Sequence, residues 1–317
     1  MITNYPKFRL PVYLFNRFLA LVHTLICGTS ICGTGICGTG ILPVFQASTM
    51  LAPQHYKKSK ESRAWLSKRQ NLLFALLIVA HLLPLWLFKY FPSQDGPSHI
   101  YNSNVLHEYF FPERGLFREY FVINHQLVPN WFIHTVLAVL MYIVPPLIAA
   151  KIVLSGYVIL LPVSLRYALS AIRPDTQFLS FLAFPFIYNY MVHMGFYNFS
   201  YSLPMFLFVI GYWLKHQKRF TLDNTVKLCL MSLLLYFCHL ISVVTACVAI
   251  AILTVWFVLF DSQLRQQEFN FRSLWQVLSK RALLPLCAFI PTLILAASFT
   301  LHKDKAAVEK NIYHVPI

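Results

Sequence analysis

Residues 71–90 read NLLFALLIVAHLLPLWLFKY, a stretch in which Lys89 is the one charged side chain. A mainly apolar stretch of this length meets the roughly 20-residue requirement of a membrane-crossing helix. Four further runs contain no Asp, Glu, Lys or Arg: residues 120–150, 176–214, 228–260 and 282–302. Hydrophobic residues make up 58% of the chain and charged residues 12%, whereas about a quarter of residues are charged in soluble domains. The sequence therefore predicts an all-α bundle of membrane helices.

The apolar runs divide into about eight or nine expected spans. The 33 residues from 228 to 260 suit two short spans with a turn near Cys238-His239. The remaining expected spans are residues 71–90, 131–150, 153–172, 177–193, 199–214 and 282–301. Four crossings between 131 and 214 would place the basic residues 215–219 outside, against the positive-inside rule. Either one of those four segments is therefore re-entrant or interfacial, or the rule fails locally.

The net charge of +15 is concentrated before the first span. Residues 1–69 hold nine Lys and Arg and one acid, Glu61. Such a flank is typical of the cytoplasmic side of a membrane helix or of contact with anionic headgroups. Because these basic residues are not interleaved with stacking aromatics on a polar domain, we expect no nucleic-acid partner. The sequence indicates a multi-pass integral protein of a bacterial-type cytoplasmic, or inner, membrane.

The first 56 residues differ from the remainder. They include the repeat ICGTS-ICGTG-ICGTG at 26–40, and we expect 1–56 to be a low-complexity segment before a membrane domain at 57–317. Either Met1 or Met50 serves as the true start. The cysteines of the repeat do not have the spacing of a zinc module. Residues 311–316 do not read as a natural terminus, so we expect a fragment or a shortened relative.

The external loop expected at 92–130 carries four of the eleven acids: Asp95, Glu108, Glu113 and Glu119. Asp95-Gly96-Pro97 predicts a helix start, with Asp95 either a helix cap or a reactive carboxylate. His99, Ser103 and His107 then recur every four residues, opposite Tyr101, Val105 and Tyr109. This pattern predicts an amphipathic helix on the membrane surface, with Asp95, His99 and His107 lining one cleft.

Other charged and imidazole groups of the loop have simpler expected roles. Glu108, Glu113 and Glu119 are expected to pair with Arg114 and Arg118 on a solvated face. His125 and His134 flank the return to the membrane and are expected to donate hydrogen bonds at the interface.

The arrangement resembles the GT-C superfamily of polytopic glycosyltransferases, which includes protein mannosyltransferases and bacterial aminoarabinose transferases. Members have a cytoplasmic N-terminus, one span, and a large external loop with an acid just after that span. Asp95, in Asp-Gly-Pro-Ser-His, occupies the position of that acid. The stretch 125–131, His-Gln-Leu-Val-Pro-Asn-Trp, is similar to the entry into the second span of these enzymes.

The resemblance implies transfer of a sugar from a polyprenyl-phosphate donor to an extracytoplasmic hydroxyl or amine by an inverting single displacement. Asp95 would be the catalytic base. The phosphate needs a cation, for which Arg114, Arg118 and the imidazoles of His99 and His239 are candidates. The expected substrate-binding residues are His99, His107, Arg114, Arg118, His125 and His239. A divalent metal bound by Asp95 and His99 stays open as an alternative, but one carboxylate and one imidazole are too few ligands to predict it, so no cofactor is predicted.

Two other functional classes stay open. A transporter or a lipid-carrier-binding protein without chemistry would use polar groups inside spans, such as His81 and Arg166. However, the spans hold almost no acid for an ion relay, and no inverted repeat is visible. A membrane haem protein with paired axial histidines is the third class. No two histidines of the spans share a spacing that recurs in another helix.

Overall fold

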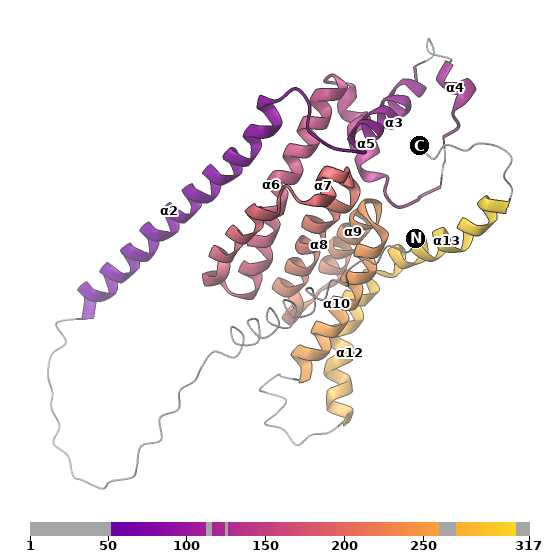
Figure 1. Cartoon of the computed structure of the whole chain (residues 1–317). Helices are drawn as coiled ribbons and strands as arrows, with labels where there is room; N and C mark the ends of the chain where they lie inside the picture. The colour runs from indigo at the N-terminus through magenta and orange to yellow at the C-terminus, as the bar shows by residue number, and fades with distance from the viewer. Residues whose placement is uncertain (1–51, 112–115, 124–125, 260–270, 309–317) are drawn as a thin grey trace, which may run out of the picture. The chain divides into compact units, whose positions relative to one another are not determined.

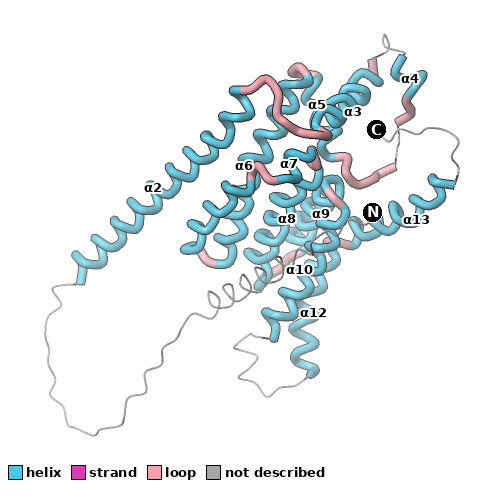
Figure 2. The backbone as a smooth tube through the Cα atoms, viewed as in Figure 1, coloured by secondary structure: helices cyan, strands magenta, loops and turns pink. Residues whose placement is uncertain are grey.

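The computed structural model describes residues 52–111, 116–123, 126–259 and 271–308. These residues form helices joined by loops, and no strand occurs among them (Figure 2). The chain divides into two compact units, residues 1–58 and 59–317. Within the first unit only residues 52–58 are described, and they are helical. All that follows concerns the second unit.

Three of the described helices are long and apolar enough to cross a membrane. They are residues 68–87 of α2 (Ala52–Leu87), α6 (Pro146–Ile172) and α10 (Leu240–Leu259). The pair α12 (Phe271–Cys287) and α13 (Ile290–Val308) is bent by 48° and supplies a fourth if it is one span. The predicted first span is therefore confirmed as a candidate. The described residues hold three or four candidate spans, and the larger number of eight or nine stays a prediction.

The segment expected as a second span, 131–150, is divided. It begins with the ten-residue helix α5 (Phe132–Met141), and four residues separate this helix from the start of α6 at Pro146. Proline is favoured at the first position of a helix because it has no N–H to leave unsatisfied there. The boundary expected between residues 150 and 153 was wrong, because it falls inside α6, which continues without a break to Ile172.

The segment expected as a fourth span, 177–193, is not one α-helix. It forms the 3-10 helix η1 (Pro174–Phe186) and the short helix α7 (Tyr190–Met194). Pro185 near the end of η1 cannot donate a backbone hydrogen bond, and its ring crowds the preceding turn, which disfavours a regular α-helix. Gly195 then ends α7 in the left-handed conformation, with φ 87°.

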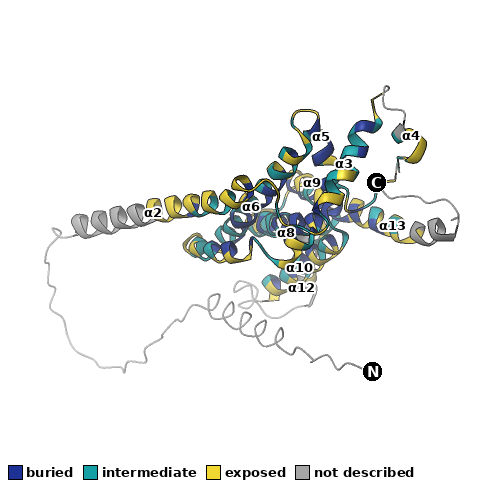
Figure 3. Cartoon of the chain, turned by 45° about the horizontal axis from the view of Figure 1, so that its top comes forward, coloured by how far each residue is buried: buried dark blue, intermediate teal, exposed yellow. Residues whose placement is uncertain are grey.

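The next helices follow the sequence prediction more closely. They are α8 (Tyr197–His216), the short 3-10 turn η2 (Gln217–Arg219), α9 (Leu222–Cys238) and α10, and the chain breaks at His239 as expected. Helices α6 and α8 lie side by side (Figure 1). Buried residues form two clusters, one around α5, α6 and the start of α8 and the other where the end of α8 meets α9 and α10. Most described side chains of α2 are exposed (Figure 3).

Helix α5 packs along α3 (Gly96–Tyr109). The rings of His99 and His134 are 5.0 Å apart, and those of His107 and Tyr142 are 4.3 Å apart. From the first pair to the second, the sequence advances eight residues on α3 and eight residues from α5, so the two helices run in the same direction. Helix α5 has ten residues and is too short to cross a membrane by itself, so the segment 131–150 does not form the single span that was expected.

Candidate functional site

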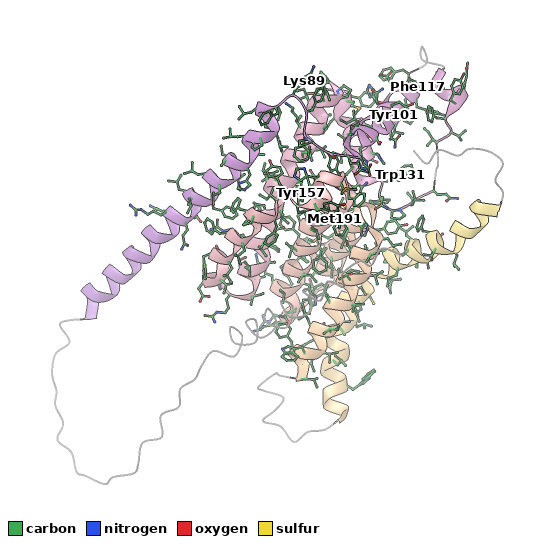
Figure 4. All side chains as sticks on the ribbon, viewed as in Figure 1. Lys89, Tyr101, Phe117, Trp131, Tyr157 and Met191 are labelled. Carbon is green, nitrogen blue, oxygen red and sulfur yellow. The ribbon has the colours of Figure 1, made fainter. Side chains whose placement is uncertain are left out.

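A cavity of about 550 Å³ lies where the start of α3 meets α5, α7 and α8. Asp95, His99 and His239, which the sequence analysis associated with one site, all line it. Met191, labelled in Figure 4, contributes from α7. The other lining residues are polar or aromatic: Ser98, Asn102, Asn130, His134, Phe196, Tyr197, Asn198 and Phe199.

Asp95 occupies the N-cap position of α3 but does not cap it. Its backbone is helical, with φ −93° and ψ −3°, whereas a capping residue normally has extended dihedrals that direct its side chain to the free N–H groups. Ser93 takes this role instead, because its Oγ accepts a hydrogen bond from the Gly96 N–H at 3.2 Å. The half-buried Asp95 carboxylate thus makes no capping hydrogen bond and lines the cavity.

The backbone around Asp95 is fixed by the segment that follows α7. The N–H groups of Gln94 and Asp95 donate to the carbonyls of His193 and Met194, at 2.9 and 3.2 Å. Gly195 comes next, and a Cβ there would lie 2.8 Å from both the Cβ and the N of Asp95. A side chain at this position would meet both a positive φ and the Asp95 backbone, so only glycine fits.

His99 and His134 form a hydrogen-bonded pair whose tautomers follow from the contacts. His99 Nε2 lies 2.8 Å from the Gly195 carbonyl oxygen, which only accepts, so Nε2 carries a proton. When the ring is neutral, its Nδ1 must therefore accept, and His134 Nε2–H donates to it at 2.9 Å. His134 Nδ1 is then unprotonated and can accept a hydrogen bond, and His134 lines the cavity.

Burial keeps both imidazoles neutral near pH 7. It lowers the pKa of His99 below the ordinary value, outweighing the Gly195 carbonyl and the negative charge of Asp95, which raise it. Burial also lowers the pKa of His134 to about 4, and the nearby His99 lowers it further. The Tyr197 ring stacks on His99 with centroids 5.3 Å apart, which restricts the orientation of the imidazole.

His239 reaches the cavity because the chain is extended there, with φ −163° and ψ 123°, between α9 and α10. Its Nδ1 lies 3.3 Å from Ser242 Oγ, and its ring meets Phe199 edge-on at 5.2 Å. Burial lowers the pKa of His239. The break that the sequence predicted at this residue therefore places an imidazole beside α8.

Two asparagines that the sequence analysis did not select shape the opposite wall. Asn198 is buried; its Oδ1 accepts from the Ile133 N–H at 3.0 Å, and its Nδ2 donates to the Asn130 carbonyl at 2.8 Å. Asn130 has φ 65°, a conformation that asparagine tolerates better than most residues. Asn198 could have been selected from the sequence, because it is a polar residue within an aromatic and apolar run. A buried amide there needs hydrogen-bond partners.

His107 does not join this cavity, contrary to expectation. It lies eight residues beyond His99, which is about 12 Å along a helix. Its ring packs against Tyr142 and Phe111, and its Nε2 is 4.0 Å from Glu108 Oε1. Glu108 is buried, so its expected place on a solvated face was wrong. Packing of α3 on α5 explains both placements.

The prediction of a polar and an apolar face for α3 is also only partly correct. Tyr101 is exposed and Val105 is buried, although the pattern placed them on one apolar side. Ser103, from the polar side, is fully buried, and its Oγ donates to the His99 carbonyl at 2.7 Å. The helix itself was correctly predicted, but contact with α5 rather than with water selects its buried face.

The remaining predicted residues lie elsewhere or outside the described chain. Arg118 is on α4 (Leu116–Tyr120), exposed, and donates to the Phe111 carbonyl at 3.1 Å; it does not line the cavity. Arg114, Glu113 and His125 lie outside the described residues, as do the cysteines of the N-terminal repeat. Within the described part of the chain, no group of three or more His, Cys, Asp or Glu could hold a metal ion.

Comparison with known proteins adds no identification. No protein-family model matches the chain, and neither curated proteins nor solved structures show significant similarity to it.

Proposed function

We propose that the protein is a membrane glycosyltransferase that moves a sugar from a polyprenyl-phosphate donor to an extracytoplasmic acceptor. The observation that carries this proposal is the Asp95 carboxylate, which makes no capping bond and lines a cavity of about 550 Å³ beside an apolar bundle. A helix cap would explain an aspartate before Gly-Pro by itself, but Ser93 already performs that role. The carboxylate is therefore left for a ligand.

In the proposed reaction the Asp95 carboxylate removes the proton from the hydroxyl or amine of the acceptor substrate. The oxygen or nitrogen of that substrate then attacks the anomeric carbon of the donor sugar. The bond from that carbon to the phosphate oxygen breaks, and polyprenyl phosphate leaves with the bonding electron pair. A single displacement inverts the anomeric configuration. A positioned general base of this kind contributes about 100- to 10,000-fold to the rate.

The rest of the cavity suits a sugar. The lining offers hydrogen-bonding groups, with His134 Nδ1 as an acceptor and the Asn102 amide as a donor and acceptor, next to the rings of Phe196 and Phe199. No Lys or Arg belongs to the described lining, so N–H groups of Asn102 and His239 are the proposed donors for the leaving phosphate. Arg118 does not line the cavity and is not retained in that role.

The proposal includes a multi-pass arrangement in a bacterial-type cytoplasmic membrane, with α5 at the interface and the loop containing Asp95 on the outer face. The basic groups support this orientation. Lys215 lies 5.9 Å from the Tyr167 ring, near the α6 end that precedes Arg173. Asp95 lies at the opposite end of α6 and α8. With α5 not crossing, residues 215–219 fall on the inner side, as the positive-inside rule requires.

The test measures release of polyprenyl phosphate from a panel of polyprenyl-phosphate sugars by the purified full chain and by Asp95→Asn. We expect the variant to keep its thermal stability and to lose transfer by at least about 100-fold. Glu119→Gln removes an exposed charge from the same loop and should retain activity. An active Asp95→Asn protein would reject the base role. Substrate flux in vesicles without donor cleavage would favour the transporter alternative.

A further inference from the structure

A second cavity, of about 560 Å³, lies where the end of α2 and the start of α6 meet α3. Two lysines, Lys89 and Lys151, line it together with apolar and aromatic side chains such as Tyr90, Phe91, Ile100 and Leu147. No Asp or Glu belongs to its described lining. Figure 4 labels Lys89 and Tyr101 at this end of the unit. The cavity thus combines two positive charges with an apolar wall.

Both lysines line the cavity beside the end of α2. Lys151, in the second turn of α6, donates from Nζ to the Phe88 carbonyl at 2.8 Å. That carbonyl follows the last residue of α2, where the backbone acceptors have no partner within the helix. Lys89 is the next residue, and its Nζ lies 5.2 Å from the Tyr90 ring. An ammonium has three N–H donors, so Lys151 retains two for a ligand.

The position of this cavity along the candidate spans indicates what could enter it. Both α2 and α6 are long and apolar enough to cross a membrane, and the cavity lies where one ends and the other begins. This is the depth at which the apolar part of a bilayer gives way to its headgroups. The exposed side chains of Leu83, Trp86 and Leu87 continue an apolar surface from α2 to this level.

We propose that this cavity binds an anionic phospholipid of the bilayer, with the lipid phosphate on Lys89 and Lys151 and the acyl chains against the apolar wall. Lysines near a membrane surface bury their stems in apolar surroundings and direct the ammonium to the headgroups. Charge complementarity selects an anionic lipid, because two cations and no acid face the site.

Tyr197 separates this lipid from the Asp95 cavity, because its side chain lines both. Its hydroxyl is hydrogen-bonded to Ser93 and packs so closely on Gly96 that a Cβ there would lie 2.7 Å away. A lipid in the second cavity therefore contacts the residue that stacks on His99 without reaching Asp95. For this reason the occupant is a bilayer phospholipid, and the proposal does not depend on the sugar-transfer chemistry.

The experiment compares binding of phosphatidylglycerol and phosphatidylcholine to the detergent-purified full chain by native mass spectrometry. We expect wild type to retain phosphatidylglycerol, and the Lys89→Gln/Lys151→Gln variant to lose about fivefold in affinity for each lysine removed. The matched control is Lys215→Gln/Lys218→Gln, which removes one lysine from the C-terminal end of α8 and one from η2 and should bind as wild type. Asp95→Asn should also bind as wild type, so that loss of transfer and loss of lipid are separable.

Three results would overturn the proposal: equal retention of phosphatidylcholine, unchanged affinity in the Lys89→Gln/Lys151→Gln variant, or binding of polyprenyl phosphate with exclusion of phosphatidylglycerol. The last would identify the cavity as a donor-lipid site. If the double variant does not fold because the bond to Phe88 is lost, Lys89→Gln alone decides the question. The Lys89 ammonium makes no hydrogen bond to a described residue, and about fivefold weaker phosphatidylglycerol binding is expected from this change alone.

Discussion

Gly195 lies directly against the backbone of Asp95, although the two residues are 100 positions apart in the chain. A Cβ on Gly195 would lie 2.8 Å from the Cβ and the N of Asp95, and the glycine itself has φ 87°. The carbonyl of the same residue accepts the Nε2–H of His99 at 2.8 Å. One residue with no side chain therefore sets the positions of both the carboxylate and the imidazole.

Gly195→Ala should disrupt this arrangement. The left-handed conformation costs a residue with a Cβ about 1–2 kcal/mol, and contact with the Asp95 backbone adds to that cost. We expect a lower unfolding temperature in detergent and a loss of transfer comparable to that of Asp95→Asn. For comparison, Gly156→Ala on α6 also creates a close contact, 2.5 Å from the Tyr201 hydroxyl, but Gly156 does not line the Asp95 cavity. This variant should therefore lower stability without the loss of transfer. Wild-type activity and stability in Gly195→Ala would contradict the contact.

Ser93→Ala should destabilise the start of α3 more than Asp95→Ala does. Loss of an N-cap side chain costs about 1 kcal/mol, and Ser93 is the residue that accepts from Gly96. Asp95 makes no such bond, so its removal should leave the unfolding temperature nearly unchanged while abolishing transfer. Thermal unfolding of both variants measures the difference. The reverse order of stabilities would show that the carboxylate caps the helix after all.

Stability should fall on mild acidification because of the buried histidine pair. An unfolded imidazole has a pKa of about 6.5, whereas burial lowers the pKa of His134 to about 4 and lowers that of His99. Between those values the unfolded chain binds more protons, so stability is fully present above about pH 6.5 and is lost as the pH falls toward 4. Unfolding temperatures from pH 8 to pH 4 give the profile.

His134→Gln tests the origin of that pH dependence, since a glutamine amide can still donate to His99 but does not titrate. We expect a shallower fall in unfolding temperature below pH 6.5 than in wild type. His216→Gln, at the far end of α8, should keep the wild-type profile. If His134→Gln and wild type lose stability in parallel, other groups cause the acid sensitivity.

Asn198→Ala should be costly, because it leaves two backbone groups without their partner. The Ile133 N–H and the Asn130 carbonyl both bond to the Asn198 amide, and an unsatisfied buried group costs about 1–3 kcal/mol. Asn130→Gly is the matched variant; glycine accepts the φ of 65° at that position, so no loss is expected. Chemical unfolding measures both. Equal stability of Asn198→Ala and wild type would contradict a stabilising role of the Asn198 amide.

Local sequence patterns were sufficient for several elements. The apolar run ending near Lys89 produced the first candidate span, Gly96-Pro97 marked the start of α3, and the chain breaks at His239 as expected. Such features depend on neighbouring residues only, through hydrophobic length, a proline without an N–H, and a helix end. The prediction of spans failed where Pro145-Pro146 and Pro185 interrupt apolar runs. There the spans had been predicted from the length of the apolar run alone.

By itself the sequence determined that Asp95 would follow the first candidate span at a helix start and that His99 would be one turn further on. Only the tertiary structure decided that the Asp95 carboxylate makes no capping hydrogen bond, that His134 and Asn198 line the same cavity, and that His107 lies elsewhere. The physical reason is packing between distant segments. The carbonyl that orients His99 belongs to a residue 96 positions later, and the face of α3 that is buried is chosen by α5.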